Sequence, residues 1–97
     1  MKEINIMLVT HHVIRRQQIK AYLSSQQFTI FEASNSSESF DKLSRYPIDI
    51  VVLGCALENE NGLDVLRNIK EKEIDTEVIM ISEHINQEDL IEALHLA

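Results

Sequence analysis

The chain has 97 residues, of which 44% are hydrophobic, and sixteen acidic against nine basic side chains give it a net charge of −7. This length allows one small domain, and the composition excludes a disordered chain. The acidic balance argues against direct binding to nucleic acid or to an anionic membrane, because most of the surface would repel a polyanion.

Short apolar runs alternate with helical patterns along the chain. Residues 4–9 are nearly all apolar, which is typical of a strand buried on both faces. A helix is predicted over residues 13–24, followed by a second strand over residues 28–33. The predicted apolar stripe of this first helix consists of Ile14, Ile19, Tyr22 and Leu23.

The second half of the chain repeats this alternation. Asn35 is followed three residues later by Glu38, which predicts a helix N-cap with its box partner, and this helix must end before Pro47. A third strand is predicted over residues 48–55, and Asn61 is expected to cap the helix that follows it. The last predicted pair is a strand over residues 77–82 and a helix that starts at Asn86 and Asp89, with the apolar face Leu90, Ile91, Leu94 and Ala97.

Repeated strand–helix units with fully apolar strands predict an α/β fold, in which a parallel sheet has helices on both faces and right-handed crossovers. In such sheets the functional site lies beyond the carboxyl ends of the strands, where the strand order reverses. The candidate site residues are therefore those that follow each strand: Thr10, His11, His12, Ser34, residues 54–61, Ser82, Glu83 and His84.

The motifs resemble the receiver domain of bacterial two-component response regulators. The similarity runs from IMLV through IDIVVLG and LENENGLDVL to EVIMIS and EDLIEALHLA, and so covers the whole chain. The details are most similar to receivers that precede a helix-turn-helix output domain, in which a histidine such as His12 often follows an acidic pair. The resemblance implies a flavodoxin-like (CheY-like) doubly wound sheet with strand order 2-1-3-4-5, of which this chain holds four strand–helix units.

The receiver family uses five side chains to bind Mg²⁺ and to accept a phosphoryl group. Thr10 and His11 stand where the resemblance implies two metal-binding carboxylates, and Gly54 stands where it implies the phosphoacceptor aspartate. Ser82 fits the expected serine or threonine, whereas the expected lysine would lie beyond Ala97. The chain is thus predicted to be an atypical receiver, or pseudo-receiver, that lacks the Mg²⁺ site and has no cofactor.

Other carboxylates are poor substitutes for the missing ones. Asp49 lies at the opposite end of the third predicted strand, roughly 16 Å from Gly54 at about 3.3 Å per residue. Glu58 and Glu83 lie on loops nearer the site and could hold a cation. Nothing at Gly54 could accept phosphate.

Several residues have both a functional and a structural interpretation. His11, His12, Glu83 and His84 could bind Zn²⁺ together, although ordinary loop histidines are the favoured interpretation. Cys55 could be a reactive thiol, but we expect a small buried hydrophobic residue. Arg15 and Arg16 are interpreted as a solvated helix face rather than a nucleic-acid patch.

The missing fifth unit has consequences for the sheet. We expect one face to be covered by the first helix alone, and residues 78–81 to form an exposed apolar edge. Either the chain is an amino-terminal fragment that ends before a fifth strand and helix, which is the preferred interpretation, or it completes itself by forming a homodimer.

The preferred functional hypothesis is a non-enzymatic interaction domain of a transcriptional regulator, which acts in the cytoplasm without aspartate phosphorylation. One cysteine and no signal peptide agree with that compartment. A histidine kinase is a possible partner, and DNA would be contacted only through an output domain outside this chain. Two alternatives stay open: a conventional regulator that acts through a heterodimer or another modification, and a metal- or thiol-dependent module on the same scaffold.

Overall fold

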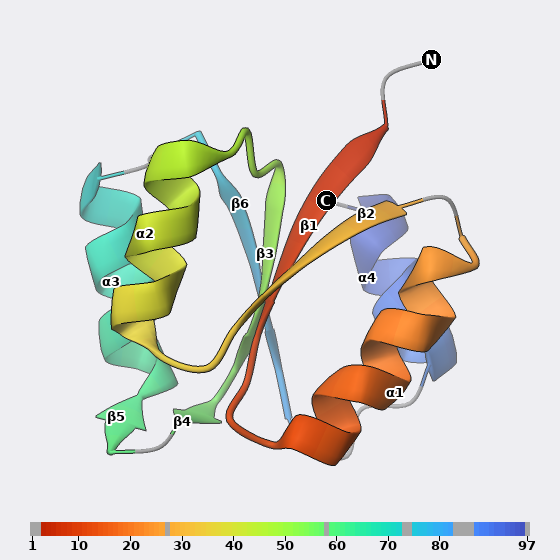
Figure 1. Ribbon diagram of the computed structural model, residues 1–97, viewed down its shortest axis with the longest axis horizontal. Helices are drawn as coiled ribbons and strands as arrows, with labels where there is room; N and C mark the ends of the chain where they lie inside the picture. The colour runs from red at the N-terminus through yellow and green to blue at the C-terminus, as the bar shows by residue number, and fades with distance from the viewer. Residues whose placement is uncertain (1–2, 27, 58, 73–74, 83–86, 97) are drawn as a thin grey trace.

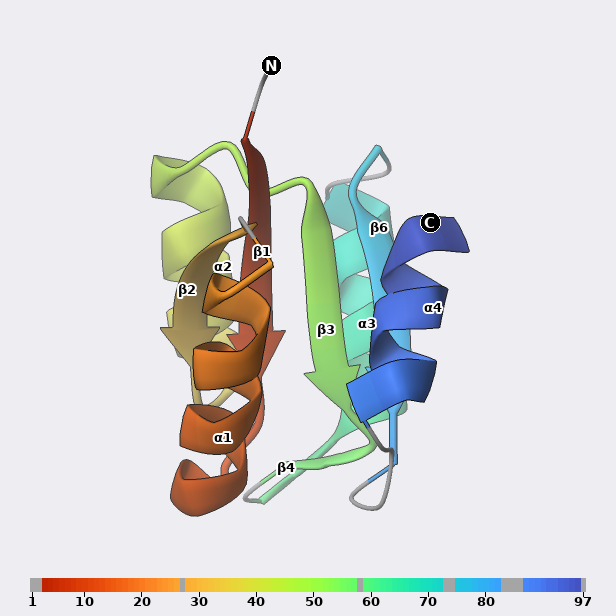
Figure 2. The same ribbon diagram turned by 90° about the vertical axis from the view of Figure 1, so that its right-hand side faces the viewer.

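The computed structural model describes residues 3–26, 28–57, 59–72, 75–82 and 87–96. A parallel four-stranded sheet forms the centre of the molecule, with the strand order β2-β1-β3-β6. Helices lie on both faces of the sheet, α1 and α4 on one and α2 and α3 on the other (Figures 1 and 2). The elements are β1 (Ile4–Val9), α1 (Val13–Ser24), β2 (Phe28–Ala33), α2 (Ser36–Arg45), β3 (Ile50–Gly54), β4 (Ala56–Leu57), β5 (Glu60–Asn61), α3 (Gly62–Lys72), β6 (Glu77–Ile81) and α4 (Gln87–Leu96).

The predicted alternation of strands and helices is confirmed, and the bounds of α1 and β2 are those predicted. The third strand is shorter than predicted, because Ile48 forms a turn with Tyr46 and the chain bends away after Gly54. A small antiparallel hairpin of β4 and β5, which the sequence did not predict, fills the connection to α3. The predicted start of the last helix at Asn86 lies outside the described residues.

The central strands β1 and β3 are buried on both sides, as their apolar sequences predicted. Alternate side chains enter two hydrophobic clusters, one beneath α1 and α4 and the other beneath α2 and α3. The side chain of Ile14, in contrast, is 73% exposed, so its assignment to the apolar stripe of α1 is wrong. Ile19 and Leu23 lie one turn apart on the buried face, and Ile14 lies outside that row.

Helix α4 corrects the expectation that α1 alone would cover one face of the sheet. Leu90 and Leu94 of α4 are buried in the same cluster as Ile19 and Leu23 of α1. The apolar face of α4 therefore covers part of the same side of the sheet as α1. The expectation that β6 lies at the edge of the sheet is confirmed for the described residues.

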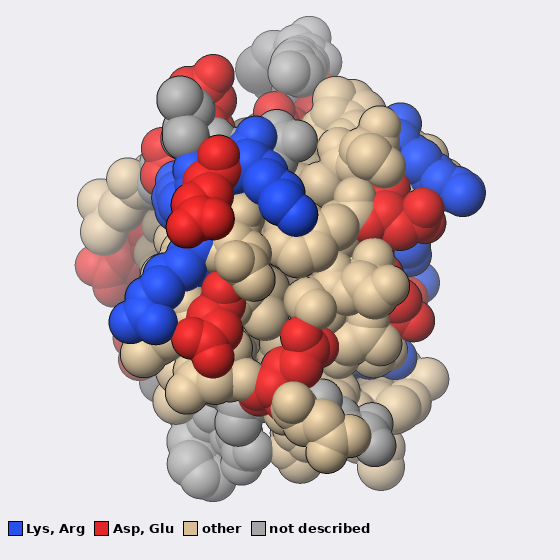
Figure 3. Space-filling view, turned by 90° about the vertical axis from the view of Figure 1, so that its left-hand side faces the viewer, with Lys and Arg blue, Asp and Glu red and all other residues tan. Residues whose placement is uncertain are grey.

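Charged side chains of both signs are mixed on one face of the molecule. On the face formed by α2 and α3, lysine and arginine side chains lie beside acidic ones (Figure 3). No helix within the described ranges is long and apolar enough to cross a membrane.

Candidate functional site

The carboxyl ends of β1, β3 and β6 meet at one edge of the sheet, as expected for parallel strands. They bring Thr10, Gly54 and Ser82 together around one pocket, while His11 is half-buried beside it. The cavity has a volume of about 20 Å³, which is room for a single water molecule. The residues that line it are Thr10, His12, Arg15, Ile19, Gly54, Cys55, Ile81 and Ser82.

Gly54 ends β3 with a backbone that any residue could adopt. Neither described glycine has a positive φ. A Cβ atom added at Gly54 would lie 3.4 Å from the carbonyl oxygen of Val9 and 3.7 Å from Cβ of Thr10, which are ordinary contacts. The absence of a side chain at this position is therefore not a requirement of the fold.

Thr10 shapes the turn between β1 and α1. Its backbone N–H donates to the carbonyl of Ala33 at 3.1 Å, and its Oγ1 accepts from the N–H of His12 at 3.3 Å. The rings of His11 and His12 are tilted against each other, with centroids 4.3 Å apart. Thr10 is buried and lines the pocket, and its hydroxyl has a structural role in this turn.

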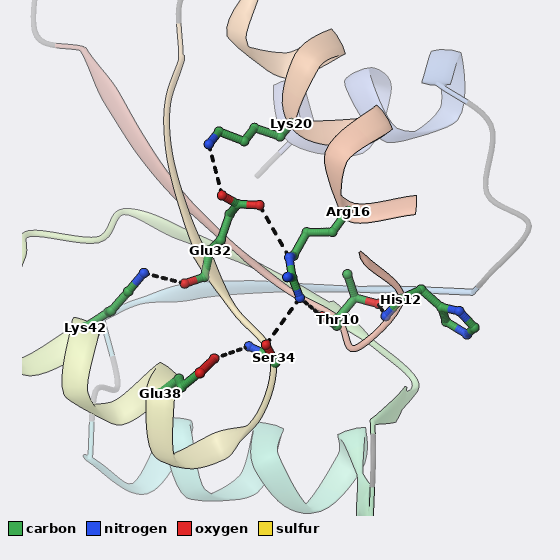
Figure 4. Close-up of polar contacts among 8 residues, drawn as sticks. All are labelled: Thr10, His12, Arg16, Lys20, Glu32, Ser34, Glu38 and Lys42. Atoms are coloured by element: carbon green, nitrogen blue, oxygen red, sulfur yellow. Dashed lines mark hydrogen bonds and ion pairs between the residues drawn. The ribbon is translucent and has the colours of Figure 1, made fainter. Parts of the chain in front are cut away.

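Arg16 brings a positive charge to this corner of the site (Figure 4). Its Nη1 donates to the carbonyl oxygen of Thr10 at 2.6 Å and to Oγ of Ser34 at 3.3 Å, and its Nε lies 3.3 Å from Oε1 of Glu32. Lys20 holds the other oxygen of Glu32 at 2.9 Å. The guanidinium therefore links α1 to the ends of both β1 and β2.

These contacts explain the acidity of Glu32. The hydrogen bond from Lys20, reinforced by the positive charges of Lys20 and Arg16, holds the pKa of Glu32 below the ordinary glutamate value, and partial burial opposes this shift. The Arg16 side chain is only 15% exposed. The interpretation of Arg15 and Arg16 as a solvated helix face is therefore wrong, since both are partly buried.

A signal for this cluster was present in the sequence. Arg16 and Lys20 are four residues apart and so share one face of α1. Glu32 is a carboxylate in an otherwise apolar strand, where an unpaired charge would be costly. Their meeting nevertheless depended on which face of α1 turned toward β2.

Helix α2 begins beside this cluster, as its capping signal predicted. Oδ1 of Asn35 accepts from the N–H of Glu38 at 2.9 Å. The carboxylate of Glu38 accepts from the N–H of Ser34 at 2.7 Å, one residue before the partner of a standard capping box. This backbone hydrogen bond is the main cause of the lowered pKa of Glu38.

The hairpin of β4 and β5 is fastened to the start of α2. The carboxylate of Glu60 accepts from the backbone N–H of Ser36 at 2.9 Å and also from the Ser36 hydroxyl. A negative charge is favourable there because the first N–H groups of a helix are unpaired and partly positive. Sequence reasoning missed this contact, which joins residues 24 positions apart.

Gly62 closes the same loop by a close backbone approach. Its N–H donates to the carbonyl of Cys55 at 3.0 Å. A Cβ atom at this position would lie 2.4 Å from the carbonyl oxygen of Gly54 and 2.8 Å from that of Cys55. The loop after β3 therefore requires a glycine at its end, in contrast to the position of Gly54.

The expectation that Cys55 is a buried hydrophobic residue is wrong, because this free cysteine is exposed. The backbone N–H of Cys55 donates to the carbonyl of Ile81 and its carbonyl accepts from the N–H of Gly62, as the chain leaves the sheet. Asp49 lies at the opposite end of β3, where Oδ2 accepts from the N–H of Asn5 at 2.8 Å, so it is distant from the pocket as expected.

The residues of the hypothetical zinc site and the alternative carboxylates belong only in part to the ranges that the structure describes. Glu58, Glu83 and His84 lie outside the described residues. Among the residues that the structure does describe, no three His, Cys, Asp or Glu side chains form a metal-binding group.

An α/β domain with this strand order and with its pocket at the carboxyl ends of the strands has the CheY-like receiver fold. The chain belongs to the response regulator receiver domain family, whose family model matches residues 6–97. The fold class predicted from the sequence is therefore confirmed.

Relatives and solved structures agree with this assignment. The regulatory protein VirG of Agrobacterium tumefaciens is 31% identical over 93 residues, which are 95% of this chain and 34% of that protein. A MaeR response regulator mutant bound to sulfate superposes with a TM-score of 0.77 at 25% identity, over 99% of this chain and 80% of the other. A response regulator receiver protein of Pseudomonas putida superposes with a TM-score of 0.80 at 21% identity, over 100% of this chain and 82% of the other, which shows the shared fold.

The chain spans only about a third of the length of curated relatives such as VirG. The activity and partners of a whole regulator therefore do not transfer directly to this chain. The comparisons assign to this chain only the receiver domain of two-component response regulators.

Proposed function

We propose that this domain is a pseudo-receiver that regulates through protein contacts and is not phosphorylated on an aspartate. It would act in the cytoplasm as the regulatory part of a transcriptional response regulator. DNA would then be contacted by an output domain outside this chain, and a histidine kinase or a second regulator would be a possible protein partner.

The main support is the side-chain set at the end of the central strands. Gly54 has no side chain that could form an acyl phosphate, although a Cβ atom would fit at this position. Thr10 and His11 provide no carboxylate, whereas Mg²⁺ binds through oxygen ligands and prefers carboxylates. The described residues of the pocket therefore do not fit the metal that aspartate phosphorylation needs.

The positive charge of Arg16 supports the same proposal. Its guanidinium already donates to the carbonyl of Thr10, so a carbonyl oxygen beside the pocket is bound to a cation from the chain itself. A second cation placed close to this guanidinium would be repelled. We infer that Arg16 keeps the end of β1 in a fixed conformation in which neither metal nor phosphate is required.

Intact mass spectrometry tests the proposal. The protein is incubated with acetyl phosphate and Mg²⁺, and we expect its mass to stay unchanged, while a conventional receiver in the same tube gains one phosphoryl group. An acid-labile phosphoryl adduct on this domain would refute the proposal.

A matched variant asks whether the side chains alone limit the chemistry. Replacing Thr10 and His11 by aspartate together with Gly54→Asp introduces the three missing carboxylates, one of them at a position where the Cβ atom fits. We expect Mg²⁺ to shift the backbone NMR signals of residues around the pocket in this variant and not in the native protein. Mg²⁺ shifts of equal size in the native protein would contradict the proposed loss of the metal site.

A further inference from the structure

The loop after β3 ends in an asparagine and a glycine, and the fold needs each of them for a separate reason. Oδ1 of Asn61 accepts from the N–H of Leu63 at 2.8 Å and so satisfies one of the first donors of α3. Gly62 is buried against the carbonyls of Gly54 and Cys55, where no Cβ atom fits. These two structural demands create the single Asn–Gly pair of the sequence.

An Asn–Gly pair is chemically labile when the backbone around it can move. Asparagine is a thermolabile residue, and the glycine after it has no Cβ atom to hinder its nitrogen from approaching the side chain. The nitrogen of Gly62 forms a bond to Cγ of Asn61, and the bond between Cγ and Nδ2 breaks. The amide proton of Gly62 leaves with the side-chain nitrogen as ammonia, and a cyclic imide remains.

Water then opens the imide at one of its two carbonyl carbons. Its hydroxyl group adds to that carbon, and its proton returns to the glycine nitrogen. Attack at Cγ gives aspartate, whereas attack at the backbone carbonyl carbon gives isoaspartate, in which the main chain is one carbon atom longer. Both products replace a neutral amide by a carboxylate.

The folded loop opposes this reaction at both reacting groups. The N–H of Gly62 donates to the carbonyl oxygen of Cys55 at 3.0 Å, so the proton that must leave is already bound to an acceptor of the protein. The carboxamide of Asn61 is fixed by the N–H of Leu63, and the backbone of Asn61 pairs with Ala56 in the hairpin. Ring closure would break these bonds and leave a buried carbonyl without its donor, which is unfavourable. The loop must therefore open before the pair can react.

A clamp on α2 opposes that opening. Glu60, the residue before Asn61, accepts from the backbone N–H of Ser36 at 2.9 Å and also from the Ser36 hydroxyl. Loops open locally at a lower cost in free energy than the whole domain unfolds, and each contact that fastens a loop raises that cost. Loss of the clamp should therefore raise the fraction of molecules with an open loop while the sheet stays folded.

We propose that Asn61–Gly62 is a deamidation site that the folded domain keeps closed, and that it reacts only in molecules whose loop after β3 has opened. The co-reactant is water. The Glu60 clamp sets how often the loop opens, and so it sets the rate at which a new carboxylate appears at the start of α3. The reaction does not depend on whether the domain accepts phosphate.

Peptide mapping by mass spectrometry measures the reaction on the 97-residue chain. Native protein and protein held unfolded in guanidinium chloride are incubated at the same mildly alkaline pH and then digested with trypsin, which releases residues 46–67 as one peptide. Asn59 lies in the same peptide before a glutamate and is the internal reference. We expect Asn61 to react at least about tenfold more slowly in the native protein, because opening must break several hydrogen bonds. Equal rates in the two states, or an Asn61 no faster than Asn59 in the unfolded chain, would overturn the proposal.

A pair of variants separates the opening of the loop from general stability. Glu60→Ala removes the clamp and leaves the reacting pair unchanged, so we expect it to react at least about threefold faster than the native protein. The matched control is Glu38→Ala, because Glu38 also accepts from a backbone N–H beside the start of α2, but from that of Ser34. The control should react within about twofold of the native rate. Equal acceleration of both variants, or of neither, would contradict the proposed role of the loop.

Hydrogen exchange provides a readout that does not depend on deamidation. The amide of Gly62 should exchange faster in Glu60→Ala by about the same factor as the deamidation rate, because both processes need the same opening. Asn61→Asp should keep the slow exchange of the native protein, since aspartate also caps a helix. Fast Gly62 exchange in the native protein, or exchange that does not follow the deamidation rate, would overturn the proposal.

Discussion

The two glycines of the β3–α3 connection allow a sharp test of how the site is built. Gly62→Ala places a methyl group 2.4 Å from the carbonyl oxygen of Gly54, and backbone atoms would have to move to relieve this overlap. Gly54→Ala places its methyl group no closer than 3.4 Å to the oxygen of Val9. The two substitutions have the same chemistry but opposite steric consequences.

Helix propensity alone would predict that Gly62→Ala stabilises the protein. This residue begins α3, where alanine should be more favourable than glycine by up to about 1 kcal/mol. Forced displacement of packed backbone costs about 1–3 kcal/mol and occasionally more. We therefore expect Gly62→Ala to lower the free energy of unfolding by about 2 kcal/mol or more, and Gly54→Ala to change it by less than about 1 kcal/mol.

Urea denaturation followed by circular dichroism measures both values on the same scale. A small domain has only about 5–15 kcal/mol of stability, so a loss of about 2 kcal/mol shifts the midpoint clearly. If Gly62→Ala were as stable as the native protein, the close approach at Cys55 would not constrain the loop. If Gly54→Ala were strongly destabilised, glycine would be a steric requirement there, and the argument that a side chain was free to occur would fail.

Three further predictions concern the charge cluster and α4. Arg16→Gln should lower the free energy of unfolding by about 1.5–3 kcal/mol, because three partners lose a charged donor. The control is Arg45→Gln, which removes an ion pair whose arginine is 66% exposed and should cost under about 0.5 kcal/mol. Equal losses of the two variants in urea titrations would contradict the role of Arg16. Because the pKa of Glu32 is lowered in the folded state, the unfolded chain binds a proton at this residue more readily than the folded one. The stabilisation that ionised Glu32 gives the fold is therefore fully present above about pH 4.3, the ordinary glutamate value. It is lost as the pH falls through the folded pKa. Glu32→Gln should flatten that acid loss in thermal melts, and an unchanged acid slope would rule out Glu32 as its source. Leu94→Ala should cost about 3 kcal/mol and Leu96→Ala less than about 0.5 kcal/mol, since these side chains are 5% and 81% exposed; similar melting temperatures would show that α4 does not cover the sheet.

Much of the candidate site was visible in the sequence because it follows from strand ends. Thr10, Gly54 and Ser82 each follow an apolar run, and parallel strands bring such positions to one edge. The side chain of Cys55 was predicted incorrectly, because the pattern of a buried strand does not reveal where the chain turns out of the sheet. Glu60 was missed because its partner, Ser36, is distant in sequence and lies in another element.

The sequence by itself determined the order of strands and helices, the cap at Asn35 and the absence of a carboxylate at Gly54. Periodicity, capping and residue identity act over a few neighbouring residues, and they can be read without knowing the fold. Only the tertiary structure decided that α4 lies beside α1 and that Arg16 bridges Thr10 and Glu32. Both outcomes depend on which apolar surface and which unpaired polar groups remain once the sheet has formed, because burial and charge pairing are satisfied across the whole molecule and not along the chain.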